Sequence, residues 1–249
     1  MQAAIDSYED RKASILHRAF TGELTAEWRR FNNVPDSSWQ LKSFDDVAEV
    51  KSNLVDPAEY MDYPHIAPDN IEKKTGTLLG YHTVAEDGVK RSKHLFFAGQ
   101  ILYSKIRPYL SKVVIVDFDG LCSADMYPIE PKVGIGTRFL WYYMLSDEFL
   151  EQASTAGSRS VLPKINQKEL GRIQIRVTGM GEQAEIVRIL DSMLTKESAA
   201  KDAAEQAIAQ IDVMKKSILA RAFRGELGTN DPNDEPAIEL LKRSLLAKA

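Results

Sequence analysis

Apolar positions recur every three or four residues along the last third of the chain, with no Pro or Gly between Glu182 and Phe223. Steps of three and four alternate, with Glu197 as the one break, which is the heptad pattern of a helix that packs along a narrow seam. A helix of about 42 residues would be roughly 60 Å long. We expect the seam to pair with another helix through Ile186, Leu190, Met193, Ala200, Ala204, Ala207, Ile211, Met214 and Ile218.

The end of this helix has a second copy near the N-terminus. The segments KASILHRAFTGEL (12–24) and KKSILARAFRGEL (215–227) are identical at ten of 13 positions. Both end on Gly-Glu-Leu, which is typical of a helix that closes on a glycine, here Gly22 and Gly225. The first copy follows Met1 after only about five turns, so it predicts a short N-terminal helix. We expect the chain to be half of a larger molecule or of a dimer.

The middle of the chain has a different pattern. Short runs rich in β-branched and aromatic residues alternate with Gly, Pro, Asn and Asp, which predicts strands within 46–55, 94–106, 112–118 and 173–177. A helix is expected over 138–151 after Thr137, another from Asn166 to Gly171, and a last one after Pro236. The fold class is therefore α+β. Its expected parts are a helical end (1–30), a globular domain (31–179), a long helix (180–227), and a linker with a C-terminal helix (228–249).

Composition limits the function classes. The 249 residues carry a formal charge of −4, so a nucleic-acid site would have to be a local basic patch. The single cysteine, Cys122, excludes an internal disulfide and a thiolate zinc cage. Neither an apolar run of the roughly 18 residues that a membrane span needs nor a secretory signal is present, which favours a cytoplasmic protein.

Several segments together resemble the DNA-specificity (S) subunit of bacterial type I restriction-modification enzymes. They are the two SIL-x-R-A-F-x-G-E-L helix ends, LTAEWR (24–29), GSRSVLPKINQKELGRIQIRV (157–177), GEQAEIVRILD (181–191) and NDEPAIELLKR in the tail. No single segment is specific, but their order is. The family usually has a Pro shortly before the Glu-Gln pair, whereas this chain has Val177-Thr178-Gly179-Met180-Gly181 before Glu182.

The resemblance implies a non-catalytic DNA-recognition module. In that family each of two target-recognition domains reads one half of a split DNA site, and helices separate them and dock methyltransferase subunits. This chain resembles the C-terminal half of such a subunit. The implied partners are double-stranded DNA, methyltransferase (M) subunits and, through them, the restriction (R) subunit. We expect the heptad seam to have no partner helix in this chain, so a homodimer through antiparallel long helices would restore two-fold symmetry.

Positive charge is concentrated in two segments. Residues 72–112 hold eight Lys or Arg against three acids, a local charge of +5, and residues 157–176 have a local charge of +4. Basic residues neutralise phosphates, and Arg grips guanine with two hydrogen bonds. The candidate DNA contacts are Lys90, Arg91, Lys93, Tyr103, Ser104, Lys105, Arg107, Tyr109, Ser158, Arg159, Ser160 and Lys164. The alternative is that the lysines are ordinary solvated charges and that the tyrosines pack in the core.

Catalytic motifs are missing from the sequence. It contains no Asn-Pro-Pro-aromatic methyltransferase motif, no Walker A loop, no Gly-x-Ser-x-Gly, and no metal-ligand spacing among its four histidines, so no cofactor is expected. Pro35-Asp36 with Glu49-Val50-Lys51 fits the loose PD…ExK nuclease pattern, which would need both acids on one metal ion. The alternatives to a DNA-recognition module are this nuclease and a helical scaffold or inhibitor that occupies the methyltransferase docking site without reading DNA.

Overall fold

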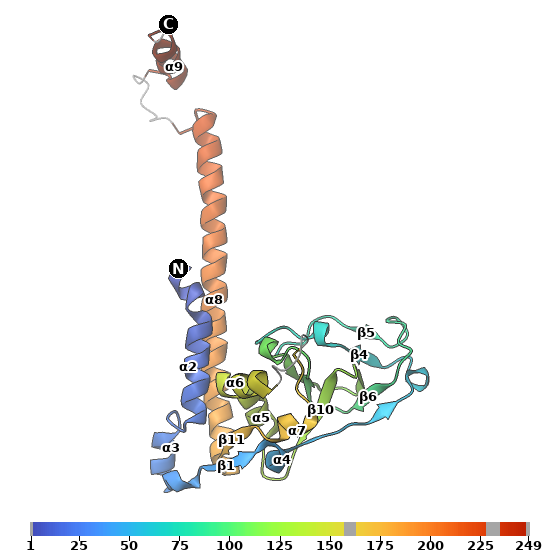
Figure 1. Cartoon of the computed structure of the whole chain (residues 1–249). Coiled ribbons are helices and arrows are strands. Elements are labelled where there is room, and N and C mark those ends of the chain that lie inside the picture. The colour runs from blue at the N-terminus through green and yellow to red at the C-terminus, as the bar shows by residue number, and fades with distance from the viewer. Residues whose placement is uncertain (1, 157–162, 228–234, 248–249) are drawn as a thin grey trace. The chain divides into compact units, whose positions relative to one another are not determined.

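The computed structural model describes residues 2–156, 163–227 and 235–247, and the chain divides into two compact units. The larger unit covers 10–195, and the smaller one combines 1–9 with 196–249. The helices, shown in Figure 1, are α1 (Gln2–Asp6), α2 (Tyr8–Phe20), α3 (Ala26–Phe31), α4 (Phe44–Val47), α5 (Thr137–Met144), α6 (Asp147–Ala156), α7 (Gln167–Gly171), α8 (Met180–Phe223) and α9 (Ala237–Leu246). The short 3₁₀ turns in these described ranges are η1 (Asp36–Ser38), η2 (Pro57–Glu59), η3 (Pro68–Asn70) and η4 (Pro108–Leu110).

The strands of the larger unit form three sheets. They are β1 (Gln40–Ser43), β2 (Ala48–Val50), β3 (Leu54–Val55), β4 (Pro64–Ile66), β5 (His82–Thr83), β6 (Lys93–Phe96), β7 (Ile101–Ser104), β8 (Val113–Ile115), β9 (Gly120–Cys122), β10 (Met126–Pro131) and β11 (Gln174–Val177). The strand orders are β1-β11, β2-β10-β7-β8 and β3-β6-β9-β4-β5. Among the strands of the described residues, β4 and β9 pair in parallel and the other pairs are antiparallel. The β1–β11 ribbon carries the chain into the globule and out again.

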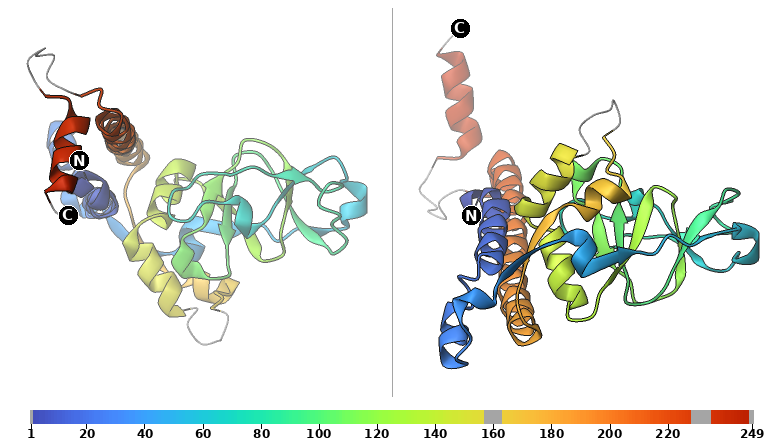
Figure 2. Two further views of the ribbon diagram at one scale, coloured as in Figure 1. Left: turned by 90° about the horizontal axis from the view of Figure 1, so that it is seen from above. Right: turned by 60° about the horizontal axis from the view of Figure 1, so that its bottom comes forward.

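Helices cover one end of the globule, and the strands β4, β5 and β6 form the other (Figures 1 and 2). One apolar cluster joins α2, α5, α6, the β2-β10-β7-β8 sheet and the first turns of α8, and a second lies among β4, β6, β8 and β9. Phe20 of α2 makes edge-to-face contacts with Phe139 and Tyr143, at ring centroid distances of 5.4 and 5.2 Å. Arg138 of α5 forms a bidentate ion pair with Asp191 of α8. The larger unit thus holds α2, α5 and the start of α8 together.

Most predicted elements are confirmed. The predicted runs contain β2, β3, β7, β8 and β11 and all of β6 but its first residue, Lys93. The helix α7 follows Asn166, α8 covers the long helical pattern, and α9 follows Pro236. The single helix predicted over 138–151 is wrong, because α5 ends at Met144 and α6 starts at Asp147. Buried Ser146 lies between them, and its hydroxyl donates to the Tyr143 carbonyl and accepts from the Phe149 N–H. Such local hydroxyl bonds compete with a continuous helix.

The heptad seam divides into two parts. Ile186 and Leu190 are buried in the core of the larger unit, and Met193 packs against it, so the expectation that the whole seam lacks a partner in this chain is wrong. The first turns of α8 lie beside α2 (Figures 1 and 2). Of the remaining positions, Ala200, Met214 and Ile218 are exposed and Ala204, Ala207 and Ile211 are half-buried.

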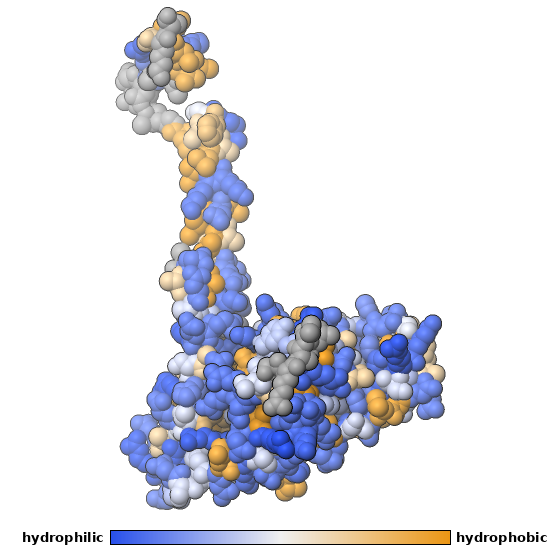
Figure 3. Space-filling view, in the orientation of Figure 1, coloured by the Kyte–Doolittle hydropathy of each residue, from blue (hydrophilic) through white to orange (hydrophobic). Residues whose placement is uncertain are grey.

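The smaller unit exposes apolar side chains. Tyr8 contacts Lys201 of α8 through a cation–π pair, with Nζ 5.1 Å from the ring centroid. Toward its C-terminus α8 exposes Val213, Met214, Ile218, Leu219 and Phe223, and hydrophobic residues interrupt the hydrophilic surface of this helix in Figure 3. Among the described helices, none has a stretch long and apolar enough for a membrane span.

Candidate nucleic-acid interface

Backbone hydrogen bonds hold a basic loop, residues 105–111, at the end of β7. The Lys105 N–H donates to the Asp125 carbonyl (3.0 Å), and its own carbonyl accepts from the Ile165 N–H (2.9 Å). The Arg107 N–H donates to the Pro163 carbonyl (2.7 Å). The loop is therefore held between the turn before β10 and the segment at 163–165, two places that are far apart in the sequence.

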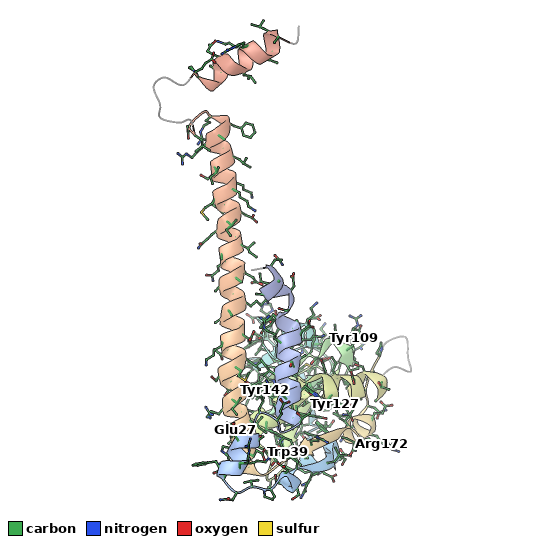
Figure 4. All side chains as sticks on the ribbon, turned by 90° about the vertical axis from the view of Figure 1, so that its left-hand side faces the viewer. Glu27, Trp39, Tyr109, Tyr127, Tyr142 and Arg172 are labelled. Carbon is green, nitrogen blue, oxygen red and sulfur yellow. The ribbon has the colours of Figure 1, made fainter. Side chains whose placement is uncertain are left out.

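The backbone of this loop is also unusual. Arg107 and Ser111, on either side of η4, both adopt left-handed conformations, with φ values of 48° and 45°. Such conformations cost about 1–3 kcal/mol in a residue other than glycine, and they often occur at functional sites. The geometry leaves Arg107 and Tyr109 exposed on the surface (Figure 4 labels Tyr109).

Lysine side chains gather beside the loop. Lys105 Nζ lies 4.9 Å from the ring centroid of Tyr127, and Lys164 Nζ lies 3.6 Å from Asp125 Oδ1. Burial, and then the charge of Lys164, lower the pKa of Lys105 below its ordinary value. The structure thus brings Lys105, Arg107 and Lys164 into one basic region, since Ile106 also pairs with Lys164 in an isolated bridge.

The other predicted DNA contacts do not belong to this basic region. Tyr103 is 1% exposed and packs edge-to-face on Phe149, and Ser104 is buried with its hydroxyl donating to the Ile106 carbonyl. Because neither side chain reaches the surface, we leave both out of the interface. Lys90 and Arg91 are exposed in the loop before β6, and Lys93 Nζ donates a hydrogen bond to the Arg91 carbonyl (3.1 Å), so these three basic residues lie apart from the loop 105–111 in the described contacts. Ser158, Arg159 and Ser160 lie outside the described residues.

Two residues of the interface were not predicted. Asp125 and Tyr127 flank Met126, the first partner of Ser104 in the β7–β10 pairing, and this register brings them to Lys105. No local sequence signal marks either residue, because their position depends on which strands pair. Ser104, which pairs with Met126 between them, was predicted to contact DNA but is buried.

The two acids of the nuclease pattern lie in different elements, and each is paired with a basic side chain. Asp36 is paired with Arg29, and the Glu49 carboxylate accepts a hydrogen bond from Lys51 Nζ at 2.7 Å, which lowers the pKa of Glu49. Asp36 lies in η1 at the helical end of the ribbon, whereas Glu49 lies in β2. Within residues 2–156, 163–227 and 235–247, no group of three or more His, Cys, Asp or Glu side chains is arranged to hold a metal ion.

Comparison with known proteins identifies the family. The model of the type I restriction modification DNA specificity domain matches residues 36–209. The EcoDI specificity subunit, from a type I restriction enzyme of Escherichia coli, is 44% identical over 237 residues, which cover 87% of this chain. The chain belongs to the type I DNA-specificity family. It spans 53% of the EcoDI subunit, about half the length of the curated relatives that it matches.

Solved structures of this family share the fold of this specificity-family chain. The HsdS subunit from Thermoanaerobacter tengcongensis matches 91% of this chain and 53% of its own length, with a TM-score of 0.59 and 17% identity. A chain from a structure titled for complex assembly and conformational transition of the type I R-M system matches 90% of this chain and 58% of its own length, with a TM-score of 0.58 and 16% identity. At this identity the likeness concerns the fold, an α+β globule with a long helix.

Proposed function

We propose that this specificity-family chain is a DNA-recognition module that reads one half of a bipartite target and performs no chemistry itself. The observation that supports this most directly is the basic loop 105–111, which presents Arg107 and Tyr109 from a hydrogen-bonded backbone beside Lys105 and Lys164. A preorganised loop loses little conformational freedom on binding DNA. An exposed Arg offers guanine two hydrogen bonds, and the lysines offer phosphates a positive surface.

The module would direct other subunits to its site. The relatives are subunits of type I restriction enzymes, and we propose methyltransferase subunits, with the restriction subunit bound through them, as partners. These partners work on DNA, which places the proposed module in the bacterial cytoplasm. The exposed apolar positions of α8 give such a partner, or a second copy of this chain, a surface to cover.

The repeat supports the use of this surface. In the first copy, Ile15, Leu16, Ala19 and Phe20 are buried in the core of the larger unit. In the second copy, the equivalent residues Ile218, Leu219 and Phe223 are exposed. A sequence that packs in one copy and is exposed in the other fits a docking role for the second copy. Dimerisation through this half of α8 is therefore part of the proposal.

DNA binding by variants of the basic region tests the recognition role. Fluorescence anisotropy on a cognate duplex should show that Arg107→Ala weakens specific binding by roughly 5- to 150-fold, the effect of one lost base contact. Lys164→Met should weaken binding to all sequences and reduce the slope of log affinity against log salt by about 0.9 for each lost phosphate contact.

The matched control is Lys42→Met on β1, which removes one positive charge from the ribbon rather than from the basic region. It should leave the specific affinity and the salt slope nearly unchanged. Equal affinities of wild type, Arg107→Ala and Lys164→Met for the cognate duplex would reject this interface. An intact complex with the methyltransferase, combined with no DNA preference in wild type, would instead support a scaffold.

A further inference from the structure

A single buried carboxylate gathers the chain segments that connect the helices with the globule. Glu182, in the first turn of α8, is 1% exposed. Its Oε1 accepts hydrogen bonds from Thr25 Oγ1 (2.6 Å), Arg29 Nη1 (2.5 Å) and Trp39 Nε1 (3.1 Å). Its Oε2 accepts from Thr178 Oγ1 (2.6 Å). We call these five residues the Glu182 network, and Figure 4 labels Trp39.

Two of the donors flank the strands of the β1–β11 ribbon. Trp39 directly precedes β1, through which the chain enters the globule, and Thr178 directly follows β11, through which it leaves. The two crossings also approach each other at this end, where the Ser38 and Thr178 hydroxyl oxygens are 3.4 Å apart. Thr25 and Arg29 belong to α3 and its N-cap, after the corner that ends α2. The Glu182 carboxylate therefore joins three chain segments: the one that enters the globule, the one that leaves it, and the start of α3.

The network is balanced in charge and hydrogen bonding. Arg29 also donates from Nε to Asp36 Oδ1 (2.9 Å) and from Nη1 to the Gly22 carbonyl (2.8 Å). Burial raises the pKa of Glu182, but the hydrogen bonds from Thr178, Thr25, Arg29 and Trp39 outweigh it and hold that pKa below its ordinary value. A buried charge pair is stable only when its geometry satisfies both partners, so the network strongly favours one arrangement.

The neighbouring Gln183 reinforces this joint. Its side-chain amide donates to the carbonyls of Thr178 (2.7 Å) and Gly134 (2.9 Å), and its carbonyl oxygen accepts from the Gly136 N–H (2.8 Å). Gly134 and Gly136 belong to the turn between β10 and α5. Glu182 thus connects the start of α8 to the ends of the ribbon, and Gln183 connects it to the turn of the globule before α5.

The second repeat copy lacks the residues of this network. The positions equivalent to Thr25 and Arg29, 203 residues later, are Gly228 and Pro232. Neither residue can supply the hydroxyl or guanidinium donors that Glu182 receives. The shared helix end therefore does not explain the network, which is a separate property of the junction between the first copy and the globule.

We propose that Glu182 is a positioning residue, which fixes the angle at which the β1–β11 ribbon and the globule leave α2 and the start of α8. If the proposed DNA function holds, Glu182 also sets the position of the basic loop relative to the long helix. An apolar core alone holds packed surfaces together with little directional preference, whereas four hydrogen bonds to one carboxylate define a direction.

The distance between two spin labels on the full chain measures this angle. Asp117→Cys in the globule and Thr195→Cys on α8 are exposed sites within the larger unit, and the native thiol of Cys122 is buried. Pulsed electron resonance should give one narrow distance distribution in the wild-type background. Glu182→Gln replaces a carboxylate oxygen with an amide N–H₂ group, which cannot accept hydrogen bonds from the donors of the Glu182 network. The distance distribution should therefore broaden, and its mean should shift.

Two further variants separate orientation from folding. Thr178→Val removes one hydrogen bond at nearly constant volume, and it should broaden the distribution even if Glu182→Gln does not fold. Ile66→Ala in the second apolar cluster lowers the melting temperature without touching the joint, and its distribution should match wild type.

Unchanged distributions in Glu182→Gln and Thr178→Val would overturn the proposal, as would an equal broadening in Ile66→Ala. The labels report on the joint whether or not the chain binds DNA. Failure of the proposed DNA function would therefore appear separately, as wild-type protein that binds no preferred duplex.

Discussion

Replacing the same phenylalanine in each repeat copy should have very different effects on stability. Phe20 is 0% exposed, lies between Phe139 and Tyr143, and belongs to the core of the larger unit, whereas Phe223 is 89% exposed. Truncating a buried Phe to Ala costs about 3–5 kcal/mol, because apolar burial is lost and a cavity remains. Truncating an exposed side chain changes stability by no more than about 0.5 kcal/mol.

Thermal and urea unfolding of Phe20→Ala and Phe223→Ala measure this difference. For a chain of this size, about 3–5 kcal/mol corresponds to a loss of roughly 6–20 °C in melting temperature, and Phe223→Ala should melt with wild type. The measurements require a dilution at which sedimentation shows a monomer. An equally large loss in monomeric Phe223→Ala would refute the reasoning, because Phe223 would then be buried within a single chain.

Three further outcomes follow from individual contacts. The pKa of Glu182 is lowered in the folded chain, so the ionised carboxylate should stabilise the fold at pH values above its unfolded pKa, near 4.5. This stabilisation should be lost as pH falls through the folded pKa. The urea midpoint of wild type should therefore decline with acid more steeply than that of Glu182→Gln. Burial raises the pKa of the Cys122 thiol, so a thiol reagent at pH 8 should label it only in urea, and prompt labelling of native protein would contradict its burial. Gly120→Ala should lower stability by about 1–3 kcal/mol, because a Cβ would lie 2.5 Å from Phe96 and 2.8 Å from the Pro64 carbonyl oxygen, whereas Gly179→Ala meets nothing within 4 Å and should cost less in the same urea titration.

Regular patterns made much of the fold predictable. The heptad positions and the absence of Pro and Gly predicted α8, and β-branched runs predicted strands that the structure confirms. The break between α5 and α6 was missed because it coincides with a single serine, Ser146, whose hydroxyl bonds the Tyr143 carbonyl and the Phe149 N–H. The apolar pattern of 138–151 does not register these bonds. The partner of the first seam positions was missed because Ile186 and Leu190 are buried in a core that is built from residues far away in the sequence, including those of α2.

The site was less predictable than the fold. Lys105, Arg107 and Lys164 lie in segments whose positive charge is visible in the sequence, and the structure brings these three residues into one region. Tyr103 belongs to the same segment but lies in β7, a strand whose four residues are all buried. Tyr127 and Glu182 depend on long-range pairing, so no neighbouring residue indicated their contacts.

Selection of duplexes from a randomised DNA pool tests the central proposal most directly. The purified chain, with and without a type I methyltransferase subunit, would be incubated with the pool across a salt series in the presence of Mg²⁺. The proposal predicts enrichment of one short motif, with affinity that falls steeply as salt rises and with intact DNA. Tight binding of the methyltransferase with no enriched motif would contradict the recognition role, and cleavage of the duplex by the chain alone would contradict its non-catalytic assignment.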